Sequence, residues 1–236
     1  MLKISDTERR KHVSFNAFYF EQNHLKHLRN MKDIFQHIND INLWSSPESM
    51  SGNGSTAKQT TALKLNLQTL LQRLKIKTLL DAPCGDFGWL GEVELNVQQY
   101  IGVDIIESMI NNHMQSYKHD SRFKFILSDL TQDVLPTADL ILCRDCLVHF
   151  SNEAIFQALR NFKKTKCRYL LTTTFIDCKE NIDIITGDWR PINLEIAPFN
   201  FPKPITKIIE GCTEGNGLYS DKSLGLWEIE KIRFCP

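Results

Sequence analysis

Short apolar runs separated by amphipathic segments dominate the chain from residue 76 onward. Five of these runs are almost continuously apolar and rich in β-branched residues, which is typical of strands buried on both faces. They cover residues 76–82, 100–105, 123–127, 138–143 and 169–175. Residues 107–117 and 152–164 show helical patterns between them. This alternation predicts right-handed βαβ units and a parallel sheet.

The two ends of the chain depart from this alternation. Residues 205–210 and 224–232 predict two more strands without a helix between them, which gives a seven-stranded, mostly parallel sheet with an antiparallel C-terminal hairpin. A helix is expected over residues 56–73, after a loop rich in Ser, Gly and Pro. We therefore expect residues 1–55 to be an accessory region of helix and loop, and residues 56–236 to form one α/β domain, a three-layer sandwich.

Charge and length narrow the class of protein. The chain has 236 residues, and its 28 Lys+Arg balance its 28 Asp+Glu. A protein that binds bulk nucleic acid usually carries a basic excess, so nucleic acid is a disfavoured partner. Two short basic groups are interpreted as solvated helix faces: they are Arg9 with Arg10 and Lys11, and Lys163 with Lys164, Lys166 and Arg168. No apolar run approaches about 18 residues, so no membrane span is expected.

The seven cysteines indicate a reducing compartment. Their number is odd, and no apolar signal segment opens the chain, so a soluble cytoplasmic protein is predicted. Cys143 and Cys146 form a CxxC pair, but no second pair or histidine lies at zinc-site spacing. We therefore expect no metal site, and interpret both thiols as part of a buried strand end.

Acidic residues end three successive predicted strands. Asp81 ends the first, Asp104 the second and Asp129 the third. Open α/β sheets bind ligands beyond the carboxyl ends of their strands. Asp104 can accept hydrogen bonds from both hydroxyls of an adenosine ribose, and Asp129 can accept one from an adenine amino group. Any one of them alone is more often a turn or cap residue, but the three together favour a nucleoside pocket.

The turn after the first strand argues against a dinucleotide. Gly85 lets the backbone approach a ligand closely, because no Cβ intervenes. The sequence has no GK[ST], which excludes a P-loop, and no GxGxxG, which weakens an NAD interpretation. Asp81 stands where a pyrophosphate would lie, and it suits a ligand that bears an ammonium group.

Four motifs carry a resemblance to a known family. LLDAPCGDFGWL, YIGVDIIESMI, FILSDL and DLILCRDCLVHFS are similar to motifs I to IV of class I, Rossmann-like methyltransferases that use S-adenosylmethionine. More narrowly, the chain resembles a bacterial-type group with a DxPCGxFxW first motif and a CRDxLxH fourth motif. The likeness extends from Trp44 to Trp227. Pro83 and Phe87 replace glycines of the generic first motif, so the wrap around the methionine end is expected to differ.

The resemblance implies S-adenosylmethionine as the cofactor. It places the cofactor-binding site at a set of residues on the strand ends and the turns that follow them: Asp81, Gly85, Asp104, Ile105, Asp129, Leu130 and Arg144. The enzyme expected is therefore a methyltransferase. An NAD-type oxidoreductase and a non-catalytic nucleoside-binding protein on a related fold remain as alternatives.

The fourth strand offers candidate catalytic groups. Arg144, Asp145 and His149 follow it, at the place where the transferred methyl group would lie. His149 has the ordinary pKa nearest neutrality, so it is the best candidate for a general base, although it could instead order the turn before a helix that starts near Ser151. Arg144 and Asp145 could pair with each other or line the methionine end of the cofactor. The Asn-Pro-Pro-Tyr/Phe signature is absent, which favours an oxygen acceptor.

A long connection at residues 177–204 is expected to form the acceptor wall. A connection of this length is usually functional or disordered, and its aromatic content argues for order. Trp189 offers a flat face for a ring, and Arg190 and Asn193 offer hydrogen-bonding groups beside it. Alternatively, Trp189 and Phe199 cap the end of the sheet as core. The expected acceptor is a small molecule or a carbohydrate.

Overall fold

The computed structural model describes residues 15–25, 28 and 30–233. The predicted basic group at Arg9, Arg10 and Lys11 and the thiol of Cys235 lie outside these residues. Within the part of the chain that is described, no helix combines the length and the apolar character that a membrane crossing requires.

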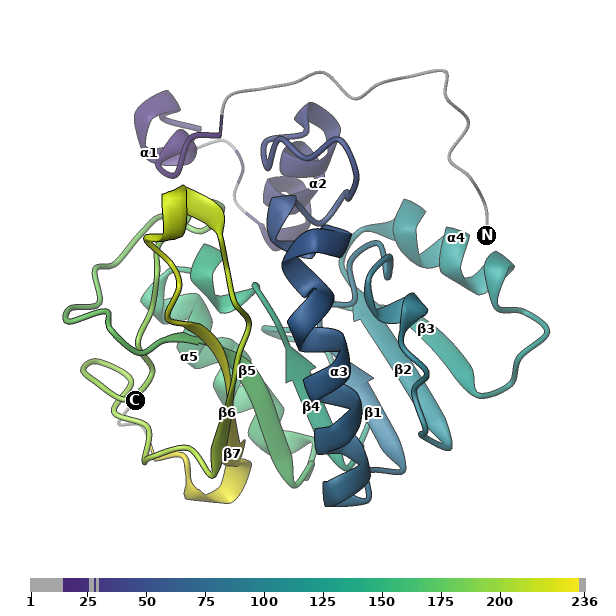
Figure 1. The fold of residues 1–236 in the computed structure, drawn as a ribbon. Coiled ribbons are helices and arrows are strands. Elements are labelled where there is room, and N and C mark those ends of the chain that lie inside the picture. Colours follow the sequence, from purple (N-terminus) through teal and green to yellow (C-terminus); the bar gives the residue numbers. More distant parts are fainter. Residues whose placement is uncertain (1–14, 26–27, 29, 234–236) are drawn as a thin grey trace.

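One seven-stranded sheet forms the centre of the molecule (Figure 1). Its strands are β1 (Thr78–Asp81), β2 (Gln99–Asp104), β3 (Phe123–Leu127), β4 (Leu140–Cys143), β5 (Tyr169–Phe175), β6 (Thr206–Ile209) and β7 (Lys222–Glu228). They lie in the order β3-β2-β1-β4-β5-β7-β6. Strands β1 to β5 are parallel, whereas β7 is antiparallel to both β5 and β6. The predicted sheet with its C-terminal hairpin is confirmed.

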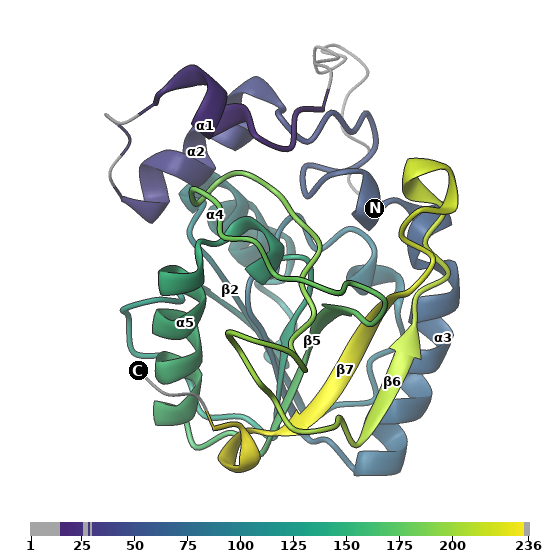
Figure 2. The same cartoon turned by 90° about the vertical axis from the view of Figure 1, so that its left-hand side faces the viewer.

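Helices cover both faces of the sheet (Figures 1 and 2). The α-helices are α1 (Tyr19–Asn23), α2 (Met31–Ile41), α3 (Ala57–Leu74), α4 (Glu107–Ser116) and α5 (Asn152–Lys164). Successive strand residues alternate between two apolar cores: Leu79 packs with α3 and α4, and Leu80 packs with α5. Fully burying such side chains contributes about 1.5–3 kcal/mol each. The predicted three-layer sandwich is confirmed.

Local capping explains where the helix that follows the fourth motif begins. The Ser151 hydroxyl accepts a hydrogen bond from the Ala154 N–H at 3.2 Å, which caps the first turn of α5. One turn earlier, a short 3-10 helix, η3 (Leu147–His149), ends at His149. The chain is thereby fixed on both sides of the candidate base.

The last strand is shorter than the apolar pattern predicts. It was expected over 224–232, but β7 ends at Glu228, and a 3-10 helix, η5 (Ile229–Lys231), follows it. Ile229 and Ile232 are buried against the α5 side of the sheet. Their apolar character therefore reflects burial of a turn rather than continuation of the strand.

The N-terminal segment lies across the carboxyl ends of the strands (Figure 1). Helices α1 and α2 share a small apolar core of Phe20, Ile34, Ile38 and Leu43. A loop with a 3-10 turn, η1 (Asn53–Ser55), leads from them to α3. This segment covers the edge of the sheet where the candidate site is expected.

Candidate functional site

Two cavities meet at the carboxyl ends of the strands. The first lies over β1, β2 and β4 and encloses about 970 Å³, open solvent at its mouth included. The second lies between the 51–54 loop and the β6–β7 hairpin. Trp44, Ser51, Asp145 and His149 line both cavities. The structure therefore offers two adjoining compartments with shared residues at their boundary.

Asp81 lies at the floor of the first cavity. Its carboxylate is buried and accepts a hydrogen bond from the Tyr100 hydroxyl at 2.6 Å. Burial raises the pKa of Asp81 to about 7, and the Tyr100 hydrogen bond offsets part of that rise. Near pH 7 the Asp81 carboxyl group is therefore only partly ionised. A positively charged ligand group beside it would stabilise the ionised form.

Asp104 ties the end of β2 to the turn after β1. One carboxylate oxygen accepts from the Gly85 N–H and the other from the Ile106 N–H, both at 2.9 Å. Burial raises the pKa of Asp104, and the backbone hydrogen bonds oppose the rise. Each oxygen still has a second lone pair, so both can accept from vicinal hydroxyls.

The end of β3 supplies the next part of the cavity wall. The Asp129 carboxylate accepts from the Thr131 N–H at 2.8 Å and hydroxyl at 2.6 Å, so it also holds its own turn. Ile105 and Leu130 line the same cavity with apolar groups. Beside them the Ser128 hydroxyl is buried and has no hydrogen-bond partner among the described residues. An orphaned buried hydroxyl at a cavity wall marks a place where a bound ligand can supply the partner.

The N-terminal segment forms the remaining wall. Met31 and Phe35 on α2 and Trp44 and Ser51 in the following loop line the first cavity. The Ser51 hydroxyl accepts from the Asp86 N–H at 3.0 Å. A Cβ placed on Gly85 would lie 2.2 Å from that hydroxyl oxygen, and Gly85 has a φ of +53°. Close approach and backbone conformation thus both require glycine at position 85.

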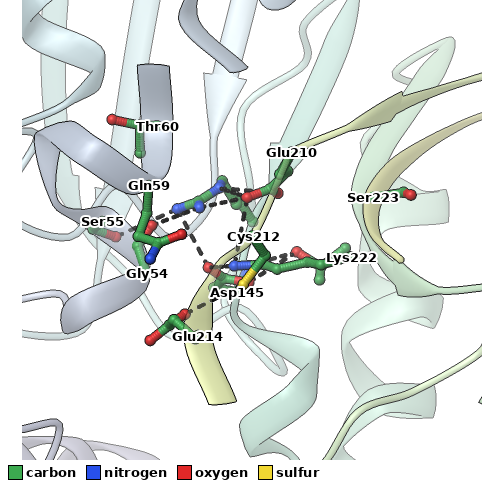
Figure 3. A network of polar contacts seen from close by, with 12 residues as sticks. Gly54, Ser55, Gln59, Thr60, Asp145, Glu210, Cys212, Glu214, Lys222 and Ser223 are labelled. Atoms are coloured by element: carbon green, nitrogen blue, oxygen red, sulfur yellow. Dashed lines mark hydrogen bonds and ion pairs between the residues drawn. The ribbon is translucent and has the colours of Figure 1, made fainter. Parts of the chain in front are cut away.

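A buried network of charged side chains stands behind the boundary between the cavities (Figure 3). The Arg144 guanidinium donates to Glu210, with its shortest contact at 2.6 Å, and to the Gly54 carbonyl at 2.7 Å. Asp145 lies 3.3 Å from Arg144 and 2.6 Å from the Lys222 ammonium. Lys222 also approaches Glu210, at 3.5 Å. Two cations and two anions therefore neutralise each other.

The network fixes the ionisation of its members. Burial alone would raise the pKa of Asp145, but Arg144 and Lys222 hold it well below its usual value. Asp145 itself has a φ of +51° and donates its N–H to the Thr173 hydroxyl at 2.8 Å. Its carboxylate is thus a permanently charged wall group and a poor base. The Arg144 guanidinium donates to protein acceptors, which suits a structural role better than a catalytic one.

His149 is held in one orientation and one tautomer. Its Nδ1–H donates to the Asp188 carbonyl at 3.0 Å, because a carbonyl oxygen can only accept. Trp44 packs on the ring, with centroids 4.8 Å apart. Burial lowers the pKa of His149 to about 4, and the Asp188 hydrogen bond opposes the shift. The ring is therefore neutral near pH 7, and its Nε2 lone pair can accept a proton.

Asp188 also connects this histidine to the N-terminal segment. Its carboxylate accepts from the Phe20 N–H at 2.6 Å and the Glu21 N–H at 3.2 Å, at the start of α1. One residue therefore anchors the covering helix through its side chain and the His149 ring through its backbone.

The structure corrects part of the expected acceptor wall. Trp189 lines the second cavity. Arg190 does not: its side chain is buried and donates to the carbonyls of Leu147, Val148 and Ile182 at 3.0–3.1 Å. Asn193 is also buried, and its amide donates to the Cys178 carbonyl at 3.0 Å. Both polar side chains satisfy backbone carbonyls, in the turn after β4 and in the 177–204 connection, instead of lining the cavity.

Several residues at the boundary were not singled out from the sequence. They are Trp44 and Ser51 from the N-terminal loop, and Glu210, Cys212, Glu214, Tyr219 and Lys222 from the β6–β7 hairpin. Glu210 and Lys222 are isolated charges in or beside apolar strands. This is the one feature of the sequence that indicates a buried ion pair. Cys143 and Cys146 are buried free thiols, and no cluster of metal-ligating side chains occurs in the described part of the chain.

Comparison with known proteins shows which domain family the residues around the first cavity resemble. Residues 79–165 match the family model of a methyltransferase domain. No curated protein matches the chain. The matched segment, residues 79–165, contains the three strand-end carboxylates around the cavity: Asp81, Asp104 and Asp129. The part of the chain around this cavity is therefore similar to a methyltransferase domain, and the match supports a methyltransferase that uses S-adenosylmethionine.

Solved structures share the fold. N-methyltransferase NodS from Bradyrhizobium japonicum aligns over 70% of this chain and 95% of its own, with 14% identity and a TM-score of 0.50. The [4+2]-cyclase SpnF aligns over 71% and 70%, with 15% identity and a TM-score of 0.52. The PH0226 protein from Pyrococcus horikoshii aligns over 75% of this chain and 93% of its own, with 18% identity and a TM-score of 0.51. A cyclase among these neighbours shows that the fold alone does not fix the reaction.

Proposed function

We propose that this enzyme transfers the methyl group of S-adenosylmethionine to a hydroxyl oxygen of a small ring-bearing acceptor, such as a carbohydrate, with His149 as the general base. The observation that carries the proposal is the meeting of the two cavities at His149 and Asp145. One cavity has the acidic strand ends that suit an adenosine and an ammonium group. The other has aromatic walls that suit a ring.

The residues of the first cavity fit the cofactor. Asp104 has two oxygens for the ribose hydroxyls, and Ile105 and Leu130 offer apolar surface for the adenine. Asp129 and the orphaned Ser128 hydroxyl supply polar groups at the same end. Asp81 and the open backbone at Gly85 suit the methionine end. We infer that the described residues of the 1–55 region act as a cover for the domain assigned to residues 56–236.

The cofactor supplies an electrophilic methyl group on a sulfonium, and the protein supplies position and proton acceptance. Trp44 and Trp189 would hold the acceptor ring so that its hydroxyl faces the first cavity. The Nε2 of neutral His149 would accept the hydroxyl proton, while the Asp188 carbonyl holds the opposite ring nitrogen. Asp145 keeps a negative charge beside the imidazolium that forms.

The position of the transferred methyl group tests this function. The enzyme would be incubated with S-adenosylmethionine labelled with ¹³C at its methyl group and with a panel of ring-bearing alcohols and amines. We expect labelled methyl on a hydroxyl oxygen, observed by mass spectrometry and by the carbon chemical shift. Transfer to nitrogen or carbon in every active acceptor would contradict the assignment of an oxygen acceptor.

The affinity for the cofactor should depend on pH through Asp81. A cationic ligand binds the ionised carboxylate, and the pKa of the free group is about 7. Affinity should therefore rise with pH, by roughly 25-fold between about pH 5.5 and about pH 7.5, and level off above about pH 8. Calorimetry over this range measures it. In Asp81→Asn the binding should be weaker and lose this pH dependence, and an unchanged pH dependence would exclude Asp81 as the titrating group.

A further inference from the structure

The second cavity has walls made largely of aromatic rings. Trp189 packs edge-on against Tyr219, with ring centroids 5.0 Å apart, and Phe175 packs edge-on against both. Phe15 extends the cluster at its outer side, with its ring centroid 6.3 Å from that of Trp189. Trp44 lines the cavity from the N-terminal loop. Aromatic faces carry negative electrostatic potential and attract cations.

The charged side chains at this cavity and in the network behind it include one carboxylate without a matching cation. Arg144 and Lys222 are matched by Asp145 and Glu210 within the buried network. Glu214 lines the cavity beside this network, and it forms no ion pair with any residue in the described part of the chain. Its one hydrogen bond there is a weak contact from the Cys212 thiol, with sulfur and oxygen 3.8 Å apart.

Glu214 lies close to the network without being neutralised by it. A Cβ placed on Gly54 would be 3.0 Å from an Asp145 oxygen, 3.3 Å from the Lys222 nitrogen and 3.4 Å from a Glu214 oxygen. Three charged groups therefore converge on one backbone position at the cavity wall (Figure 3). Burial raises the pKa of Glu214, Lys222 opposes the rise, and Asp145 adds to it. A cation beside this carboxylate would relieve both its desolvation and its repulsion from Asp145.

We infer that the acceptor carries a positively charged amino or quaternary ammonium group, which binds between the Glu214 carboxylate and the aromatic faces of the second cavity. This inference rests on the proposed function and names the substrate class: a ring-bearing alcohol that is also a cation. Its hydroxyl would lie toward His149. An anionic acceptor is disfavoured, because the nearest cations, Arg144 and Lys222, are already paired with carboxylates.

Matched pairs of probes test the charge of the acceptor. Tyramine and tyrosol share a ring and a phenolic hydroxyl and differ in an amino group against a hydroxyl, as glucosamine and glucose do. Tetramethylammonium serves as a minimal cation. Binding at about pH 7.5 would be measured by calorimetry in the presence of S-adenosylhomocysteine. We expect at least one cation to bind about tenfold more tightly than its neutral counterpart, a difference of about 1.4 kcal/mol.

Glu214→Gln assigns that preference to the carboxylate. The amide keeps the shape, so the variant should retain its affinity for neutral probes while the preference for the cation falls below about threefold. Glu230→Gln, an exposed position outside the cavity, is the matched control and should keep the preference. A preference that survives Glu214→Gln overturns the inference, as does equal binding of both members of each pair. Failure of every cation to bind at about 10 mM also overturns it.

The two proposals fail in different ways. If cations bind through Glu214 but labelled methyl never reaches a hydroxyl oxygen, O-methylation is wrong and the cation site stands. If neutral alcohols are methylated at full rate by both wild type and Glu214→Gln, methyl transfer stands and the cationic acceptor is wrong.

Discussion

Alanine at position 149 is expected to lower the rate of methyl transfer about 100-fold, because the acceptor hydroxyl then loses its proton acceptor. Affinity for S-adenosylmethionine should be nearly unchanged, since His149 lies at the boundary of the cofactor cavity and not at its acidic end. Single-turnover rates and calorimetry on the same preparation measure the two quantities. Added imidazole should restore part of the rate by entering the space that the ring leaves.

The pH profile separates a base from a structural histidine. The pKa of His149 is about 4, so the ring is already neutral at pH 6. With S-adenosylmethionine held at saturation at every pH, the wild-type rate should be flat from about pH 6 to 8, with a loss only as pH falls toward 4. His119→Ala, at an exposed position, is the matched control and should behave as wild type. A structural role would be supported if His149→Ala lowers the melting temperature together with the rate and if imidazole does not restore the rate.

The strand ends could be predicted from the sequence because two independent patterns coincide there. Continuous apolar runs locate buried strands, and Asp81, Asp104 and Asp129 each follow such a run at its carboxyl end. Parallel strands place those ends at one edge, so three separate positions become one site without any knowledge of side-chain packing. The structure has all three carboxylates around the first cavity.

The acceptor side could not be predicted in the same way. Glu210 and Lys222 reach Arg144 and Asp145 only because β7 inserts between β5 and β6, a pairing across more than sixty positions of sequence. Arg190 is a residue type that often binds ligands, yet its guanidinium donates to the carbonyls of Leu147 and Val148, in the turn after β4. A local pattern records which groups are polar, but the tertiary fold decides which of them are already satisfied.

The charged network also governs how firmly the hairpin holds the site. Its four charges come from the end of β4 and from the hairpin, and each is at least partly removed from water. Coulombic attraction in a buried pair offsets its desolvation only while both partners are present. The network therefore holds β6 and β7 against the end of β4. Its contribution to the free energy of unfolding can be measured by removing one charge.

Glu210→Gln is expected to lower the free energy of unfolding by about 3–5 kcal/mol, because Arg144 then stays buried with only Asp145 to share between two cations. For a chain of this size the melting temperature should fall by roughly 10 °C or more. Chemical denaturation and thermal melting both measure the loss. The Glu210 side chain is 1% exposed and that of Arg144 is 4% exposed, so solvent can do little to replace the missing charge.

Two further variants decide whether the pair itself is responsible. Glu107→Gln removes the carboxylate of an exposed pair with Lys32, in which both side chains are more than half exposed, and should change the melting temperature far less. Glu210→Met combined with Arg144→Met removes both charges, and it should recover part of the stability that Glu210→Gln loses, since apolar groups of similar volume can replace a buried pair. A double variant less stable than Glu210→Gln would show that the remaining charges need Arg144, and that the network acts as one unit instead of as separable pairs.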